Sequence, residues 1–328
     1  SVFKMERTYH NGIPCYHLHS QDEESEAAPS SEFTLLQDFS MPTRIQKIWE
    51  SKDRNYIFLL GEYSSQVKCL DVHQMSMKYD RHLKDEALDG ISLSDDYRKF
   101  AVLLRHRKEI EFHDPNGVYT KIRCSIQPNA MFLNEITTHV LLPSFESNIV
   151  PRLSLQDGKF HSSYHLSTGK SMIGAQAVCT LQEHNLDLIG CQDGHLRCFD
   201  PRASPSGDSN GLAPVSTVAL PSAFSAGISS IGGDPRNSFH FAVGTTAGNI
   251  LLYDLRKKNP FLVKDHCNDI PIKKIMYYQS AMAGITTDTS VSGVICSMDA
   301  RCLHFWEKQE GATVTVVEPY NPSTRKGA

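Results

Sequence analysis

Histidine and cysteine are the residues of this chain whose side chains could bind a metal or attack a substrate. His17 and His19 alternate along one predicted strand, and His161 and His165 flank an aromatic stretch, so each pair could contact a metal ion. Neither pair has a third ligand nearby in the sequence, whereas a zinc site needs three or four protein ligands. We therefore expect surface or hydrogen-bonded histidines and no resident metal.

The nine cysteines include no Cys-x-x-Cys pair. Those in predicted strands should behave as small buried hydrophobic residues with free thiols. They are Cys69, Cys191, Cys198, Cys296 and Cys302. The composition is that of an ordinary globular protein, with 21% charged residues and a net charge of -4. No signal peptide and no apolar run of about 20 residues is present, so a soluble protein of a reducing compartment, without membrane contact, is expected.

Motifs of catalysis and nucleotide binding are missing from the sequence. There is no phosphate-binding GxxxxGK[ST] loop, no GxSxG nucleophile turn and no HExxH zinc pair. The segment GISSIGG (227–233) has several glycines, but it lacks the spacing and the following helix of a nucleotide-binding loop. We predict that the protein is not an enzyme and has no cofactor and no small-molecule substrate.

The elements that must position any site are strands. The segment FAVGTTAGNILLYDLR (241–256) has the pattern of the last half of a WD40 repeat, and IGCQDGHLRCFDPR (189–202) is a near-copy of it. Each is a short apolar strand, a turn with glycine, and a second strand that ends in an aromatic residue followed by Asp. This is how a propeller blade closes, so the predicted fold is an all-β WD40 β-propeller.

The repeat can be followed along the chain by the position after the end of that second strand. This position falls on Asp71, Asp114, Ser154, Asp200, Asp254 and Glu307. The separations are 43, 40, 46, 54 and 53 residues, against about 40–45 for one four-stranded blade. Six repeats fit, and the two long separations are explained by polar loop insertions at 203–216 and 279–293.

Apolar runs predict the second strand of each repeat, buried on both faces. They lie at 54–61, 98–104, 139–143, 186–190, 239–244 and 293–297. The strand that follows, as at 66–72, 108–114, 249–255 and 302–307, has a more mixed composition, which favours a more exposed layer.

The segment GIPCYHLHS (12–20) resembles a strand placed ahead of the first repeat. We predict that it closes the ring as an outer strand of the last blade, in a seven-bladed propeller of which this chain carries six repeats; a disordered leader is the alternative. Since 312–319 already supplies an outer strand for the sixth repeat, either the seventh blade is incomplete in this chain or the ring has six blades, and we favour seven. The expected organisation is an N-terminal strand and acidic linker (1–33), the propeller (34–319) and a tail (320–328).

Propellers bind partners through loops at their rims, and basic residues gather in several such turns. These candidates for partner binding are Arg105, Arg107, Lys108, Arg202, Arg256, Lys257, Lys258, Lys264, Lys273 and Lys274. They could hold acidic protein segments or the phosphates of RNA. No aromatic-rich stacking motif accompanies the lysines, so sequence-specific RNA recognition is not supported.

Four segments resemble the nucleolar WD40 family known as nucleolar protein ten or essential nuclear protein two. They are LLQDFSMPT (35–43), SDDYRKFAVLLRHRKEIEFHDPNGVY (94–119), AVGTTAGNILLYDLRKKNPFLVKDH (242–266) and IPIKKI (270–275). The resemblance implies a nuclear, nucleolar scaffold without enzymatic activity, which docks other assembly factors of the small-subunit processome, the particle in which pre-ribosomal RNA is processed. Direct contact with that RNA stays open. Within the matched motif, His266 is placed like the turn histidine of WD40 repeats and is expected to bond within its blade.

Two Asp-x-Arg boxes in consecutive repeats support a different hypothesis. Asp200-Pro201-Arg202 and Asp254-Leu255-Arg256 are similar to the boxes of substrate receptors of cullin-type ubiquitin ligases. In that case both arginines would project from the bottom rim into a partner propeller. Many WD40 proteins carry the same box, however, with the arginine paired to a neighbouring blade.

Overall fold

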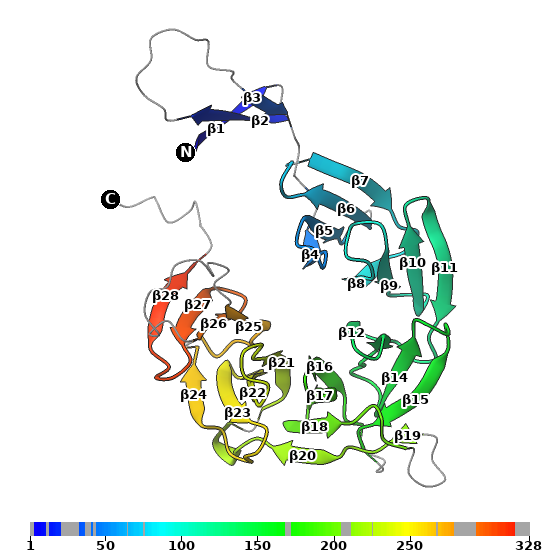
Figure 1. Cartoon of the computed structure of the whole chain (residues 1–328), viewed down its shortest axis with the longest axis vertical. Helices are drawn as coiled ribbons and strands as arrows, with labels where there is room; N and C mark the ends of the chain where they lie inside the picture. Colours follow the sequence, from blue (N-terminus) through cyan, green and yellow to red (C-terminus); the bar gives the residue numbers. More distant parts are fainter. Residues whose placement is uncertain are drawn as a thin grey trace. The chain divides into compact units, whose positions relative to one another are not determined.

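In the computed structural model, β-strands make up almost all of the regular structure (Figure 1). The structure describes residues 41–318 apart from 42–43, 64, 75, 168–171, 205–210, 225, 267 and 279–292, together with the backbone of three strands within residues 3–36. The chain divides into two compact units, residues 1–125 and residues 126–328. Within the described residues, no helix has the length and apolar character needed to cross a lipid bilayer.

The first unit contains two four-stranded antiparallel sheets built from consecutive strands. One sheet consists of β4 (Ile45–Glu50), β5 (Tyr56–Gly61), β6 (Gln66–Asp71) and β7 (Ser76–His82). The other consists of β8 (Ala87–Ser92), β9 (Phe100–Leu104), β10 (Glu109–Asp114) and β11 (Gly117–Arg123). The first strands β4 and β8 lie against each other. Phe58 and Phe100, both fully buried, contact across the two sheets with ring centroids 5.5 Å apart.

The N-terminal segment forms a sheet of its own. β1 (Phe3–His10) pairs with β2 (Ile13–Ser20), which pairs in turn with β3 (Phe33–Leu36). The prediction that residues 12–20 form an outer strand of the last blade is therefore wrong. His10 and Ile13 are register partners, and the two residues between them are Asn11-Gly12, the dipeptide that two-residue hairpin loops favour. Such a local pairing needs far less loop closure than a strand contributed to the far end of the chain.

The second unit contains four sheets, which follow one another in chain order from green to red in Figure 1. The first has β12 (Phe132–Asn134), β13 (His139–Leu141), β14 (Ile149–Ser154) and β15 (Phe160–His165). The second has β16 (Ala175–Leu181), β17 (Leu186–Cys191), β18 (His195–Phe199) and β20 (Ser216–Ala219), followed by the 3-10 helix η1 (Ser222–Phe224). The third has β21 (Ile228–Gly233), β22 (His240–Thr245), β23 (Asn249–Asp254) and β24 (Leu262–Asp265). The fourth has β25 (Lys274–Tyr278), β26 (Val294–Met298), β27 (Leu303–Glu307) and β28 (Thr313–Val317).

Neighbouring sheets of the second unit pack face to face. Their first strands β12, β16, β21 and β25 contact one another in succession. Between the second and third sheets lies a core that includes Leu188, Val243 and Tyr253, and between the third and fourth sheets lies one that includes Ile250 and Trp306. Each fully buried side chain of this size stabilises the fold by about 1.5–3 kcal/mol, so the sheets hold together mainly through these inter-sheet cores.

The repeat frame predicted from the sequence matches the sheets. All but one of its positions are the last residue of a third strand; the exception, Asp200, directly follows β18. The six predicted apolar runs are the second strands β5, β9, β13, β17, β22 and β26. The described residues thus form six blade-like sheets, not seven, and the N-terminal sheet is additional.

The expectation that the third strands form a more exposed layer is wrong for two of them. β6 and β23 are almost entirely buried, because each lies between a second and a fourth strand and also under a neighbouring sheet. The exposed layer is the fourth strand, as in β28, all of whose residues are exposed.

The predicted loop insertions lie in the long connections, but one of them contributes a strand. β19 (Gly211–Leu212), within the 203–216 insertion, adds to the outer strand β15 of the preceding sheet in parallel. Most of the second insertion, residues 279–292, lies outside the described residues. The glycines of the two near-copy turns, Gly194 and Gly248, have φ values of 74° and 84°, a conformation that a side chain would make unfavourable.

Candidate functional site

Most of the predicted basic residues lie in turns or at strand ends, at two opposite ends of their sheets. In an antiparallel sheet of consecutive strands, the connection from first to second strand and that from third to fourth lie at one end, and the remaining connections lie at the other. For the last three sheets of the second unit we call the former end the bottom rim. It comprises the turns at 182–185, 200–204, 234–239, 255–261 and 308–312. Arg202, Arg256, Lys257 and Lys258 lie on it and are exposed.

The other predicted residues lie elsewhere. Lys273 and Lys274 are exposed at the end of their sheet opposite the bottom rim. Lys264 on β24 is half-buried, and its ammonium group donates hydrogen bonds to the Gly311 carbonyl at 2.7 Å and to Thr313 Oγ1 at 2.8 Å. It therefore ties β24 to the start of β28.

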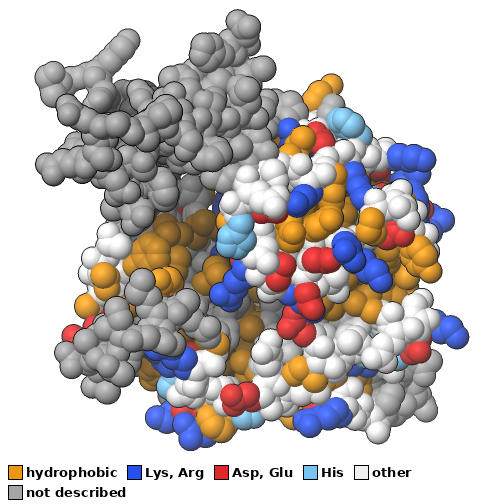
Figure 2. Space-filling view, turned by 45° about the horizontal axis from the view of Figure 1, so that its top comes forward, with side chains coloured by type: hydrophobic (Ala, Val, Ile, Leu, Met, Phe, Trp, Pro, Cys, Tyr) orange, Lys and Arg blue, Asp and Glu red, His pale blue; other side chains and the backbone are white. Residues whose placement is uncertain are grey.

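Arg105, Arg107 and Lys108 share the exposed β9–β10 turn of the first unit. Arg105 Nη1 lies 3.3 Å from Glu86 Oε1. Basic and acidic side chains are interspersed on the face shown in Figure 2. Within the second unit, the predicted residues do not form one basic surface, because they lie at opposite ends of their sheets.

The two Asp-x-Arg boxes are closed turns. Arg202 donates from Nε and Nη2 to the two carboxylate oxygens of Asp200 at 2.9 and 3.1 Å, and Arg256 makes the same pair of bonds to Asp254 at 3.0 and 2.8 Å. The arginine side chain is the first cause of a lowered pKa at each aspartate, followed by a backbone hydrogen bond. Both arginine side chains are still about two-thirds exposed, at 65% and 64%.

The Asp-x-Arg pattern occurs at three further turns of the chain, so that the boxes begin at Asp96, Asp200, Asp234, Asp254 and Asp299. In all of them an Asp oxygen accepts a hydrogen bond from the backbone N–H of the arginine two residues later, at 2.5–3.0 Å. Asp favours such turns because its side chain can hydrogen-bond to the backbone two residues on. The Asp-x-Arg pattern thus stabilises turns between the strands of this fold, and it does not by itself indicate a substrate receptor of a ubiquitin ligase.

A row of contacts through His184 and Phe239 connects the two predicted arginines along the bottom rim. Arg202 Nη2 lies 3.5 Å from the His184 carbonyl oxygen, and the His184 ring lies 4.8 Å from the Phe239 ring. The Arg256 guanidinium lies over the other end of this row, 4.6 Å from the Phe239 ring centre, a distance at which a cation is attracted by the ring. The sequence did not reveal His184 and Phe239, because they come from first-to-second-strand turns of two different sheets.

His266 has the structural role that was predicted for it. Its Nδ1 lies 3.1 Å from Asp299 Oδ2, and its Nε2 lies 3.0 Å from Ser297 Oγ, to which Trp306 Nε1 also donates at 3.0 Å. Because the carboxylate can only accept, Nδ1 carries the proton and Nε2 accepts from the serine hydroxyl. This buried network joins the loop after β24 to strands β26 and β27. His266 and Trp306 occupy the places of the histidine and tryptophan in the WD40 signature.

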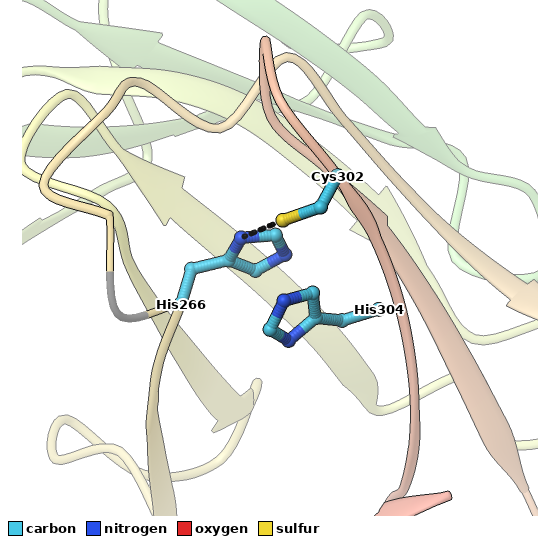
Figure 3. A group of neighbouring side chains, drawn as sticks. All are labelled: His266, Cys302 and His304. Atoms are coloured by element: carbon cyan, nitrogen blue, oxygen red, sulfur yellow. Dashed lines mark hydrogen bonds between the residues drawn. The ribbon is translucent and has the colours of Figure 1, made fainter. Parts of the chain in front are cut away.

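His266, Cys302 and His304 form the one buried group in the described residues whose donor atoms are close enough to hold a metal (Figure 3). Both ring nitrogens of His266 are already engaged, however. Burial raises the pKa of the Cys302 thiol and lowers that of His304, so at neutral pH both are uncharged. The two imidazole rings stack 3.9 Å apart. We interpret the group as packing around the His266 network.

The histidine pairs considered at the outset are not brought together as metal sites. His161 lies 3.1 Å from His139 and 3.2 Å from Asp157 on the exposed surface, without His165. His17 and His19 lie on β2, whose side chains are outside the described residues. The five cysteines of the predicted strands are free, as expected.

These features define the class of protein: an all-β β-propeller with blades of WD40 type. The family model described as Nucleolar protein 10-like, N-terminal domain, matches residues 2–325, and the chain belongs to this family. It is 32% identical over 306 residues to the Homo sapiens protein named Nucleolar protein 10, a match that covers 87% of this chain and 39% of that protein.

A Schizosaccharomyces pombe protein named Ribosome biogenesis protein enp2 homolog is 27% identical over 297 residues, or 89% of this chain and 45% of that protein. The chain thus spans less than half the length of these relatives. Among solved structures, Chaetomium thermophilum Raptor matches with a TM-score of 0.68 and 13% identity, over 86% of this chain and 25% of that one. This last likeness concerns the fold alone.

Proposed function

We propose that this chain is the propeller of a nucleolar ribosome-assembly factor that docks other assembly factors of the small-subunit precursor particle without catalysing a reaction. The relatives named above are a nucleolar protein and a ribosome biogenesis protein. Family membership over residues 2–325 is the observation that carries the proposal. Packed sheets with exposed turns suit such a role, because the sheets of one unit can hold partners in a fixed register.

The bottom rim is the docking surface we favour within this function. It presents the row from Arg202 to Arg256 and the adjacent Lys257 and Lys258. Arginine and aromatic residues are enriched at the centres of protein interfaces. The Asp200 carboxylate holds the Arg202 guanidinium in place, and the Asp254 carboxylate and the Phe239 ring hold that of Arg256, so little side-chain entropy is lost when a partner binds.

The test is to tag the full-length protein in cells and to analyse what co-purifies. Small-subunit precursors with their assembly factors are expected, and a cytosolic complex free of pre-ribosomal RNA would contradict the proposal. Charge reversal of Lys257 and Lys258 should reduce recovery of at least one assembly factor. The matched control reverses Lys273 and Lys274, at the opposite end of the neighbouring sheet. If only the control reduces recovery, the docking surface lies at that end and the assignment to the bottom rim is wrong.

A further inference from the structure

A cavity opens on the bottom rim between the third and fourth sheets of the second unit. Its volume is about 290 Å³. Its walls come from the turn that precedes β22, from Phe261 before β24, from Tyr277 and Tyr278 on β25, and from Lys308 after β27. This space is at the lower limit for small-molecule sites, so it suits a single inserted side chain better than a metabolite.

The inner part of the cavity carries no free charge. Lys308 Nζ lies 2.5 Å from Asp234 Oδ2, and the two side chains are only 15% and 6% exposed. Burial lowers the pKa of His240, which keeps this imidazole neutral at physiological pH. The aromatic side chains at the mouth are accessible, with Phe261 exposed by 42% and Tyr278 by 57%. An apolar group that entered the cavity would bury these rings and leave no charge unpaired.

Basic residues lie in the lining of the cavity and in the turn next to it, in contrast to its interior. Arg236 lies in the lining, and Lys257 and Lys258 lie in the turn that ends at Phe261. All three are exposed, and none makes an ion pair within the described residues. Arg256 of the same turn differs, since its charge is compensated by Asp254. An occupant should therefore bring negative charge beside its apolar anchor.

We propose that this cavity binds an acidic peptide segment of a partner protein, which inserts one aromatic or large aliphatic side chain between the two sheets. Uncompensated cations beside an apolar cavity are the complement of acidic residues that flank such an anchor. A nucleic acid fits less well. Its affinity comes mainly from many phosphate contacts, whereas Arg236 is the one lining cation that makes no ion pair within the described residues, Lys257 and Lys258 lie in the adjacent turn, and the chain as a whole has a net charge of -4. The inference deepens the proposed docking function by naming the chemistry of one partner.

Selection from a displayed library of random peptides on the purified chain tests this inference without a known partner. We expect enriched peptides with Asp and Glu around one aromatic or large aliphatic residue. Charge reversal of Lys257 and Lys258 should weaken their binding about tenfold, and more so at low salt. Tyr278→Ala should weaken it at all salt concentrations. Lys273→Glu is the control and should leave affinity unchanged. Thermal unfolding of each variant checks that it is folded.

Three outcomes would overturn the inference: no enrichment of acidic peptides, binding that is insensitive to the Lys257, Lys258 and Tyr278 changes, or tighter binding of single-stranded RNA of matched length at the same residues. The last outcome would assign the cavity to a nucleobase. Failure here is distinguishable from failure of the proposed function. Co-purification with small-subunit precursors can succeed while the cavity binds no peptide, which would refute this inference alone. If the cavity binds acidic peptides but no precursor co-purifies, the proposed function fails and the inference about the cavity stands.

Discussion

Glu111 on β10 allows a quantitative test of the energetics of the first unit. Its side chain is only 2% exposed, and its carboxylate lies 2.5 Å from Lys121 Nζ and 3.5 Å from His113 Nε2. The neighbouring His113 is the largest influence and Lys121 adds to it; together they outweigh burial and lower the pKa of Glu111 from 4.5 to about 2. The carboxylate is therefore more acidic in the folded protein than in the unfolded chain.

Because the pKa of Glu111 is lower in the folded protein than in the unfolded chain, Glu111 stabilises the fold at neutral pH and not in acid. Above the unfolded pKa of 4.5, Glu111 is ionised in both states and its full stabilisation is present. As the pH falls towards about 2, the unfolded chain takes up the proton first, and the stabilisation is lost. A pKa shift from 4.5 to about 2 contributes about 3 kcal/mol to the free energy of unfolding at neutral pH. About 2 kcal/mol of this contribution is lost between about pH 7 and about pH 3.

The measurement is urea unfolding of the wild type and Glu111→Gln at about pH 7 and about pH 3. The loss of unfolding free energy between the two pH values should be about 2 kcal/mol smaller in the variant. Glu109→Gln, on the same strand but partly exposed, is the matched control and should follow the wild type. If Glu111→Gln also loses as much stability on acidification as the wild type, the assigned coupling to His113 and Lys121 is wrong.

Three further predictions concern buried polar groups of the blades. Ser297→Ala removes the hydroxyl group shared by Trp306 and His266 and should cost about 2 kcal/mol in thermal unfolding; an unchanged melting temperature would contradict the network. Asp187 accepts hydrogen bonds from Tyr164, Thr180 and Asn134, at 2.6, 2.7 and 2.9 Å. Asp187→Ala should therefore cost about 3 kcal/mol and speed hydrogen exchange in β17, and exchange at the wild-type rate would refute this. Burial raises the pKa of Cys69 to about 12, so its thiol should resist a thiol reagent at neutral pH until the protein unfolds, and rapid labelling of the native chain would disprove it.

Strand order and strand ends could be predicted from the sequence because each blade repeats a local pattern. An apolar run, a turn with glycine and a strand that ends in an aromatic residue can all be recognised within about 20 residues. The position of Asp254 at the end of β23 was predicted in this way. Sheet membership at the N-terminus was not. The Asn11-Gly12 dipeptide is a hairpin signal of the same local kind, and it favours the local pairing of β1 with β2 over closure of the ring.

For the bottom rim, the sequence predicts individual exposed residues but not which of them lie side by side. Arg202 and Arg256 were identified as exposed turn residues, and the structure places them so. What connects them, His184 and Phe239, belongs to turns 55 residues apart in the sequence. No local sequence pattern predicts that these two turns are neighbours. Their contact arises only when the two sheets pack against each other through β16 and β21. The cavity beside them is formed by sheet packing in the same way.

Charge alone is therefore a poor guide to which rim residues meet a partner. Arg256 is compensated by Asp254 and lies over Phe239, so Arg256→Ala should act mainly by leaving that carboxylate unpaired and the ring uncovered. Lys257 follows it in the chain and has no such partner within the described residues. Its charge is available to a docking segment, and its removal should slow association in a salt-dependent way with little effect on stability. Of the predicted cations on this turn, Lys257 and Lys258 are thus the ones whose charge a partner can compensate, whereas Arg256 contributes to docking through the fixed shape of the row that it forms with Phe239.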